Sequence, residues 1–147
     1  MTDELRIDRL IDAPPDVVFD TFTADEDGRL AFYGHDDPGW IVESDCDLRV
    51  GGLWTITFGP SRSRLFHHRH SFEVIDRPRR LVLATTERRP DGSSFDFTIE
   101  FTFQARDGGT LMTLIQSGFP TAELREEHGR GVPDGFARLE RAVRASA

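Results

Sequence analysis

The sequence is poor in cysteine and in long apolar runs, and each shortage excludes a class of protein. Cys46 is the single cysteine among 147 residues, so an internal disulfide is excluded and a reducing compartment is favoured. A run of about 18 apolar residues is absent, which excludes a membrane-spanning helix. The first residues, 1–4, are acidic and lack the apolar core of a signal peptide. We therefore expect a soluble, cytoplasmic protein with no membrane partner.

Lysine is absent, and basic residues are outnumbered by acidic ones. The 18 basic residues are all arginines against 26 acidic ones, which gives a formal net charge of −8. Neutralising nucleic-acid phosphates requires a basic surface, so we expect no nucleic-acid partner. Codon usage explains the absence of lysine more simply than a demand for bidentate guanidinium contacts.

The length and the apolar content are sufficient for one hydrophobic core. A chain of 147 residues buries roughly 68–70% of its unfolded surface, so it needs neither disulfides nor a structural metal for stability. Hydrophobic residues make up 37% of the chain, and 12 of them are phenylalanines. We expect a single domain over residues 1–147, because no linker or internal repeat divides the sequence.

The first 34 residues predict one strand and two short helices. Leu5, Ile7 and Ile11 alternate with charged residues, which is typical of a half-buried strand. Two prolines then end this alternation of apolar and charged residues. After them the spacing is helical, because Val18 and Phe22 lie four residues apart on one helical face. Residues 24–34 predict the second short helix.

Residues 40–117 predict an antiparallel sheet. In the clearest strand, Phe95, Phe97, Ile99, Phe101 and Phe103 alternate with polar residues, so this strand buries one face and exposes the other. Glycines and prolines mark the turns, and residues 59–61 are expected to end a strand. The expected strands cover residues 40–49, 53–58, 65–76, 81–88, 95–103 and 110–117.

The last segment predicts a helix. Phe136, Leu139 and Val143 share one face, whereas Pro133 and the glycines before it predict a break at 129–133 and a regular helix over 134–145. The fold class is therefore α+β, with a curved antiparallel sheet of about seven strands around a long C-terminal helix. One narrow helical stripe is too small to cover so wide an apolar face. We expect a ligand cavity between sheet and helix, unless phenylalanine rings fill that space.

Several segments in the same order resemble one known family. They are IDAPPDVVF at 11–19, DLRVGGLW at 47–54, EVIDRPRRLV at 73–82, GGT at 108–110, QSGFP at 116–120 and GFARLE at 135–140. Together they resemble the activator of heat-shock-protein-90 ATPase homologue-like family of the START-like (Bet v allergen-like, SRPBCC) superfamily. The resemblance covers about residues 5–145. It implies a helix-grip fold with a hydrophobic-ligand cavity, without universal catalytic residues and without a cofactor.

The sequence departs from that family in two places. Phe32 and Tyr33 stand where a Trp-Trp pair commonly ends the second helix, and Pro133 interrupts a helix that is usually continuous. Both places border the expected cavity mouth, so the resemblance does not identify the ligand. A chaperone partner is not expected, because that role belongs to members with an additional N-terminal domain, for which these 147 residues have no room.

The histidine-rich segment 67–70 is the most unusual local pattern. On a strand, His68 and His70 share a face with Phe66, while His67 points to the other face. Two histidines are too few for a metal site, and no further ligand is evident at a useful spacing, so we predict no metal. The pair could orient a ligand or transfer protons. The simplest alternative is that both are solvated strand residues.

Other candidate residues lie at inward-facing positions. Gln116 could present its amide to the cavity or satisfy backbone groups at a strand end. The aromatic residues could form a gate or simply belong to the core. Cys46 has no evident partner as a nucleophile. The predicted ligand-binding residues are Phe32, Tyr33, Trp40, Trp54, Phe66, His68, His70, Phe97, Gln116 and Phe136.

Three functions remain open, and binding of a small apolar or aromatic molecule is the leading one. The second is a small enzyme of the cyclase, dehydratase or hydrolase type that uses His68, His70 or Gln116; catalysis is not the leading expectation. The third is an interaction module for a chaperone or a regulator, which rests on the resemblance alone. An exposed edge strand would also allow a homodimer.

Overall fold

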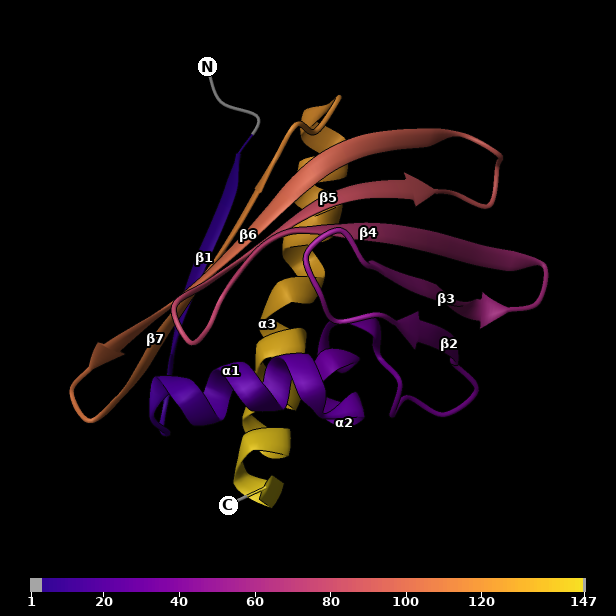
Figure 1. Cartoon of the computed structure of the whole chain (residues 1–147). Helices are drawn as coiled ribbons and strands as arrows, with labels where there is room; N and C mark the ends of the chain where they lie inside the picture. Colours follow the sequence, from indigo (N-terminus) through magenta and orange to yellow (C-terminus); the bar gives the residue numbers. More distant parts are fainter. Residues whose placement is uncertain (1–3, 147) are drawn as a thin grey trace.

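The strands predicted from the alternating pattern form one sheet in the computed structural model, which describes residues 4–146. All seven strands are antiparallel, in the order β1-β7-β6-β5-β4-β3-β2 (Figure 1). The strands are β1 (Leu5–Ile11), β2 (Ile41–Cys46), β3 (Leu53–Ser61), β4 (Arg64–Asp76), β5 (Arg80–Arg88), β6 (Ser94–Arg106) and β7 (Gly109–Ser117).

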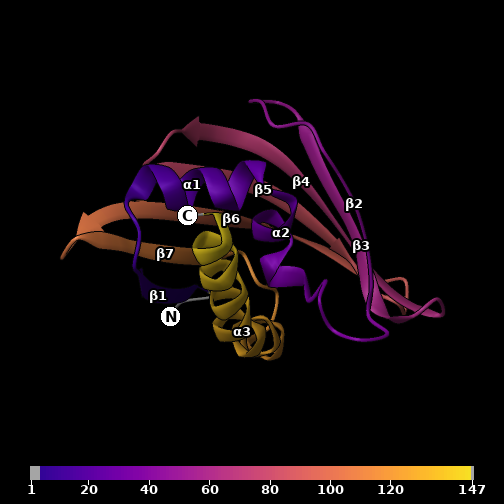
Figure 2. The same cartoon turned by 90° about the horizontal axis from the view of Figure 1, so that it is seen from below.

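The helices lie on one side of this sheet. Helix α1 (Pro15–Ala24) begins at the predicted prolines, and the long helix α3 (Ala122–Ser146) lies inside the curve of the sheet (Figure 2). The element order is the predicted one, a strand, short helices, six strands and a long helix, and the helix-grip fold is confirmed. No helix within residues 4–146 combines the length and the apolar composition that a bilayer crossing requires.

The predicted second helix is divided in two. Residues 24–34 contain α2 (Glu26–Arg29) and a 3₁₀ turn, η1 (Ala31–Tyr33). Gly34 ends this turn in the left-handed region, with φ of 73°, which a glycine adopts without steric cost. The backbone then turns toward β2, and η1 places Tyr33 beneath the sheet, where it is buried.

The predicted break in the last helix is wrong. Helix α3 is continuous from Ala122 to Ser146 with Pro133 inside it. An internal proline removes one backbone hydrogen bond and costs about 3 kcal/mol. Val132 and Phe136, on either side of it, are buried in the hydrophobic core. This packing outweighs the local cost, because tertiary contacts supply most of a helix's stability in a protein.

The predicted strand end at 59–61 is also wrong. Strand β3 continues to Ser61, and its register with β4 shifts between Phe58 and Ser61. A bulge of this kind accommodates a proline, which cannot donate a ladder hydrogen bond. Gly59 is required here, since a Cβ atom would lie 2.2 Å from the carbonyl oxygen of Arg64.

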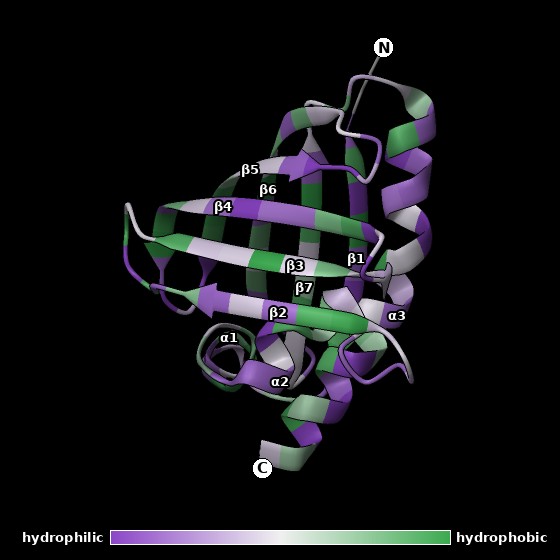
Figure 3. Ribbon diagram, turned by 90° about the vertical axis from the view of Figure 1, so that its right-hand side faces the viewer, coloured by the Kyte–Doolittle hydropathy of each residue, from purple (hydrophilic) through white to green (hydrophobic). Residues whose placement is uncertain are grey.

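The predicted inward residues form the core. Along β6 the odd-numbered residues from Phe97 to Phe103 are buried, and in Figure 3 apolar and polar residues alternate along the strands. Helix α3 contributes Phe136, Leu139 and Val143, as its pattern predicts. A second bulge, between Phe72 and Val74 in the β4–β5 pair, has a direct effect on the site described next.

Candidate functional site

A cavity of about 370 Å³ lies between the sheet, η1 and α3. Its volume falls within the roughly 300–1,000 Å³ of small-molecule pockets. Exposed residues at its edge, Glu127 and Gly131 of α3, show where it reaches solvent. The apolar lining residues are Phe22, Phe32, Tyr33, Trp40, Trp54, Phe58, Phe66, Leu83, Ile99, Phe101, Leu114 and Val132, and the polar ones are His68, His70, Glu87, Gln116, Glu127 and His128.

The register of β4 and β5 creates the polar wall of this cavity. His68 lies directly opposite Glu87, and His70 lies opposite Thr85. Cross-strand neighbours share a face of the sheet, so each pair can form a hydrogen bond. The His68 Nε2 to Glu87 Oε1 distance is 2.6 Å, and the His70 Nδ1 to Thr85 Oγ1 distance is 2.7 Å. Both histidines are buried, with exposed fractions of 7% and 0%.

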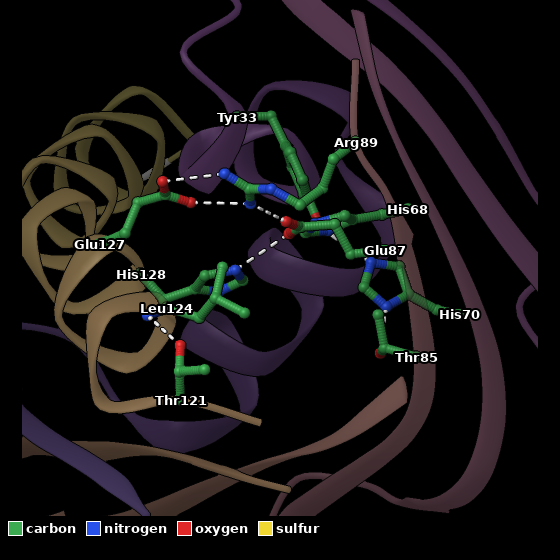
Figure 4. A network of polar contacts seen from close by, with 10 residues as sticks. All are labelled: Tyr33, His68, His70, Thr85, Glu87, Arg89, Thr121, Leu124, Glu127 and His128. Carbon is green, nitrogen blue, oxygen red and sulfur yellow. Dashed lines mark hydrogen bonds and ion pairs between the residues drawn. The ribbon is translucent and has the colours of Figure 1, made fainter. Parts of the chain in front are cut away.

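Tyr33 connects the two pairs. Its hydroxyl lies 2.8 Å from His68 Nδ1 and 2.8 Å from His70 Nε2 (Figure 4). The hydroxyl can donate one hydrogen bond and accept another, so it can satisfy both rings at once. Thr85, His70, Tyr33, His68 and Glu87 therefore form one continuous chain of hydrogen bonds, which we call the polar chain.

Glu87 is the point at which three elements meet. Its Oε1 atom also lies 2.9 Å from Nε2 of His128 on α3. Its Oε2 atom accepts a hydrogen bond from Arg89, whose guanidinium in turn binds Glu127 at 2.8 and 2.9 Å. The carboxylate is 2% exposed, and it is tolerated there because both oxygens have charged or polar partners.

The protonation states of these groups decide which atom donates and which accepts in each hydrogen bond of the polar chain. Burial raises the pKa of Glu87, but hydrogen bonds from His128 and His68 outweigh burial and hold it well below its usual value. Burial lowers the pKa of His68 and of His70, and it raises the pKa of Tyr33. Glu87 is thus ionised at neutral pH while both rings and the phenol are neutral.

Because the ionised Glu87 can only accept, the donor and the acceptor of every other hydrogen bond in the polar chain are fixed. His68 donates from Nε2 to Glu87, so its Nδ1 accepts from the Tyr33 hydroxyl. The Tyr33 oxygen then accepts from Nε2 of His70, and His70 Nδ1 accepts from Thr85. Every donor and acceptor along the polar chain is used, which is what a buried network requires.

Gln116 differs from the polar chain. It is 7% exposed and lines the cavity from β7, in register with Ile99 of β6. Its Oε1 atom is buried, and no group among residues 4–146 donates a hydrogen bond to it. A buried acceptor without a partner costs roughly 1–3 kcal/mol, so a bound molecule with a donor group would recover that cost.

Eight of the ten predicted ligand-binding residues line the cavity, and two do not. Phe97 instead stacks on Phe119 at 5.5 Å between ring centroids, and Phe136 packs edge-on against Phe32 at 5.3 Å. Both are buried core residues, with exposed fractions of 4% and 0%, and neither lies on the cavity wall. The eight lining residues are Phe32, Tyr33, Trp40, Trp54, Phe66, His68, His70 and Gln116.

The structure corrects two interpretations of the histidines. His68 and His70 are not solvated strand residues, since both are buried and the Tyr33 hydroxyl of η1 lies within hydrogen-bond distance of both rings. The sequence offered no third ligand beside them, yet Nε2 of His68, Oε1 of Glu87 and Nε2 of His128 lie within 4.8 Å of one another. The premise behind the prediction of no metal therefore does not hold.

Sequence reasoning missed Glu87, Arg89 and His128. Glu87 had a signal, because it continues the inward series Leu81, Leu83 and Thr85 along one strand. His128 lies one helical turn before Val132, but the expected break at 129–133 removed it from the helix. Its position on the buried face follows once α3 is continuous.

The fold recurs in solved structures from several sources. The chain is 21% identical to an uncharacterised protein from Rhizobium leguminosarum, with a TM-score of 0.81, covering 99% of this chain and 96% of that one. Protein CV1439 from Chromobacterium violaceum gives 23% identity, a TM-score of 0.78 and 96% coverage of both chains. DynU16, a protein from the dynemicin biosynthetic locus, gives 17% identity and a TM-score of 0.73, and the match covers 99% of this chain and 49% of DynU16.

A comparison with protein families agrees with the fold and with the sequence motifs. No curated protein matches the chain. The model of the family described as activator of Hsp90 ATPase homolog 1-like protein matches residues 12–144, which is nearly the whole chain. The chain belongs to the activator of Hsp90 ATPase homolog 1-like family.

Proposed function

We propose that the protein binds a small aromatic or apolar molecule that carries one hydrogen-bond donor. The observation that carries this proposal is an aromatic cavity of about 370 Å³ in which the buried Oε1 atom of Gln116 lacks a donor. Aromatic walls favour an apolar body, and the orphan acceptor favours one hydroxyl or N–H group on it. The polar chain is already satisfied internally, so Gln116 is the group that selects the ligand.

The test compares two probes that differ by one donor, 2-naphthol and naphthalene, by calorimetric titration of the full chain. We expect 2-naphthol to bind about 3- to 10-fold more tightly, the value of one net hydrogen bond. Gln116→Leu should abolish this preference while keeping naphthalene affinity. The control, His67→Gln, changes an exposed residue on the outer face and should alter neither affinity.

Two results would contradict the proposal. One is that neither probe binds to the wild-type chain, which would mean that the cavity takes no aromatic molecule. The other is an unchanged preference in Gln116→Leu, which would place the donor elsewhere. Native mass spectrometry of the purified protein adds an independent measurement, since it detects a small molecule that remains bound through purification.

A second candidate function, an enzyme that transfers protons, is favoured by one observation. His68 is held by an ionised carboxylate at 2.6 Å on the cavity wall, and its Nδ1 atom lies 2.8 Å from the Tyr33 hydroxyl, so the pair would transfer the proton of Tyr33 rather than meet a substrate directly. Glu87→Gln should then abolish turnover of a substrate found by screening while 2-naphthol still binds. Retained turnover would remove this candidate. The homodimer that an edge strand would allow stays a prediction, and so does the interaction-module alternative, for which a chaperone is not the expected partner.

A further inference from the structure

We propose that His68, Glu87 and His128 form a binding site for one divalent transition-metal ion in the polar wall of the cavity. This inference is independent of the organic ligand, because it uses other residues than Gln116. The three side chains come from β4, β5 and α3, which hold them on regular secondary structure rather than on loops. Their facing ligand atoms lie within 4.8 Å of one another.

The donor set is the kind that binds zinc and related ions. Two imidazole nitrogens and one carboxylate oxygen occur at open zinc sites and at non-haem iron sites, where further positions are left for water or substrate. All three residues line the cavity, so the vacant coordination positions would face its interior. The ion would therefore be reached through the cavity, not from the outer face of the sheet.

The surrounding hydrogen bonds fit a metal-bound His68. Ligation through Nε2 places the ring proton on Nδ1, which needs an acceptor, and the Tyr33 oxygen lies 2.8 Å away. Tyr33 would then donate to Nε2 of His70, and His70 would donate from Nδ1 to Thr85. Hydroxyls both donate and accept, so the hydrogen bonds among His68, Tyr33, His70 and Thr85 can run in the reverse direction between the same partners.

The local charge also fits a cation. Arg89 contacts Oε2 of Glu87 and leaves Oε1 for the ion. The positive charge of Arg89 is shared with Glu127, which binds it through both carboxylate oxygens. Histidines ligate a metal as neutral imidazoles, so two carboxylates and one guanidinium would leave a net charge of −1, and a divalent ion would be partly neutralised here.

The test uses untagged, chelator-treated full-length protein, titrated with Zn²⁺ by calorimetry and with Co²⁺ by absorption spectroscopy. We expect one equivalent of each ion and the intense visible Co²⁺ bands of a four- or five-coordinate site without sulfur. His128→Gln should weaken Zn²⁺ binding by more than about 100-fold, because a direct ligand exceeds the 10- to 100-fold effect of a supporting residue.

Tyr33→Phe is the supporting-residue variant and should weaken Zn²⁺ binding by about 10- to 100-fold. The matched control is His67→Gln, which removes a neighbouring histidine on the outer face and should leave affinity unchanged. Zn²⁺ should also raise the melting temperature of the wild type and not that of His128→Gln.

Absence of stoichiometric Zn²⁺ binding by the wild type would overturn the proposal, even if a variant failed to fold. So would equal losses in His128→Gln and His67→Gln, or a weak octahedral Co²⁺ spectrum. Naphthol binding by the metal-free protein is measured separately, so failure of this site and failure of the proposed function are distinguishable.

Discussion

Beneath α1 the concave face of the sheet is filled by phenylalanine rings, whereas beneath the first half of α3 it stays open and carries buried polar groups. Phe19 of α1 packs edge-on against Phe103 of β6 at 5.1 Å, and both are at most 3% exposed. We call this the closed region. The cavity with its polar chain is the open region.

Three strands of the sheet change from apolar to polar inward residues between these regions. In β5 the inward residues pass from Leu81 and Leu83 to Thr85 and Glu87, and in β7 from Met112 and Leu114 to Gln116. In β4 they pass from Phe72 to His70 and His68. One end of the face therefore supplies hydrophobic stability, and the other keeps polar groups that a purely structural core would not need.

The largest expected difference between the regions is in stability. Phe19→Ala should lower the free energy of unfolding by about 3–5 kcal/mol, because the closed region is fully packed and retains the resulting cavity. Phe66→Ala, at the half-buried wall of the open region, should cost about 1 kcal/mol, largely its contact with Arg89. Denaturant unfolding of both variants measures this, and equal losses would contradict the distinction.

Two glycines of α3 provide a second comparison. A Cβ atom at Gly135 would lie 2.0 Å from Cδ1 of Phe32, whereas one at Gly131 would have nothing within 4 Å. Gly135→Ala should therefore destabilise the fold by about 1–3 kcal/mol by displacing the Phe32 ring. Gly131→Ala should stabilise it by about 0.5–1 kcal/mol through helix propensity. Thermal unfolding of the pair checks the opposite signs; stabilisation in both would show that Phe32 does not depend on Gly135.

The smallest expected effect concerns the loop beside the open region. Arg138 of α3 binds Asp36 at 2.7 Å and also Asp37. Its hydrogen bond lowers the pKa of Asp36, so the stabilisation is present above the unfolded value near 3.8 and is lost as the pH falls below it. Arg138→Gln should cost less than about 1 kcal/mol at pH 7. The deficit should shrink as the pH falls below about 3.8; a deficit that does not change with pH would point to lost packing instead.

The sequence predicted the fold well because the strands and the last helix carry strong periodic patterns. Alternation along 95–103 identifies the inward face, and Phe136, Leu139 and Val143 identify the helix that covers it. Strand parity identified five of the eight predicted residues that line the cavity, whereas Phe32, Tyr33 and Trp40 were proposed as residues of an aromatic gate. Phe97 and Phe136 were misplaced, since parity shows which face a residue shares but not its depth behind neighbouring rings.

The sequence by itself determined the antiparallel sheet, its inward residues and the excess of apolar sheet surface over helix, because hydrophobic periodicity is a local property. The tertiary structure alone decided which polar groups meet. Asp76 pairs with Arg80 and Ile75 with Leu81, and that register would place Arg88 opposite His68. The bulge between Phe72 and Val74 shifts the pairing by one residue and brings Glu87 there instead, and packing around Pro133 keeps His128 on α3 above it. Register and helix continuity depend on contacts between distant segments, which no local pattern encodes.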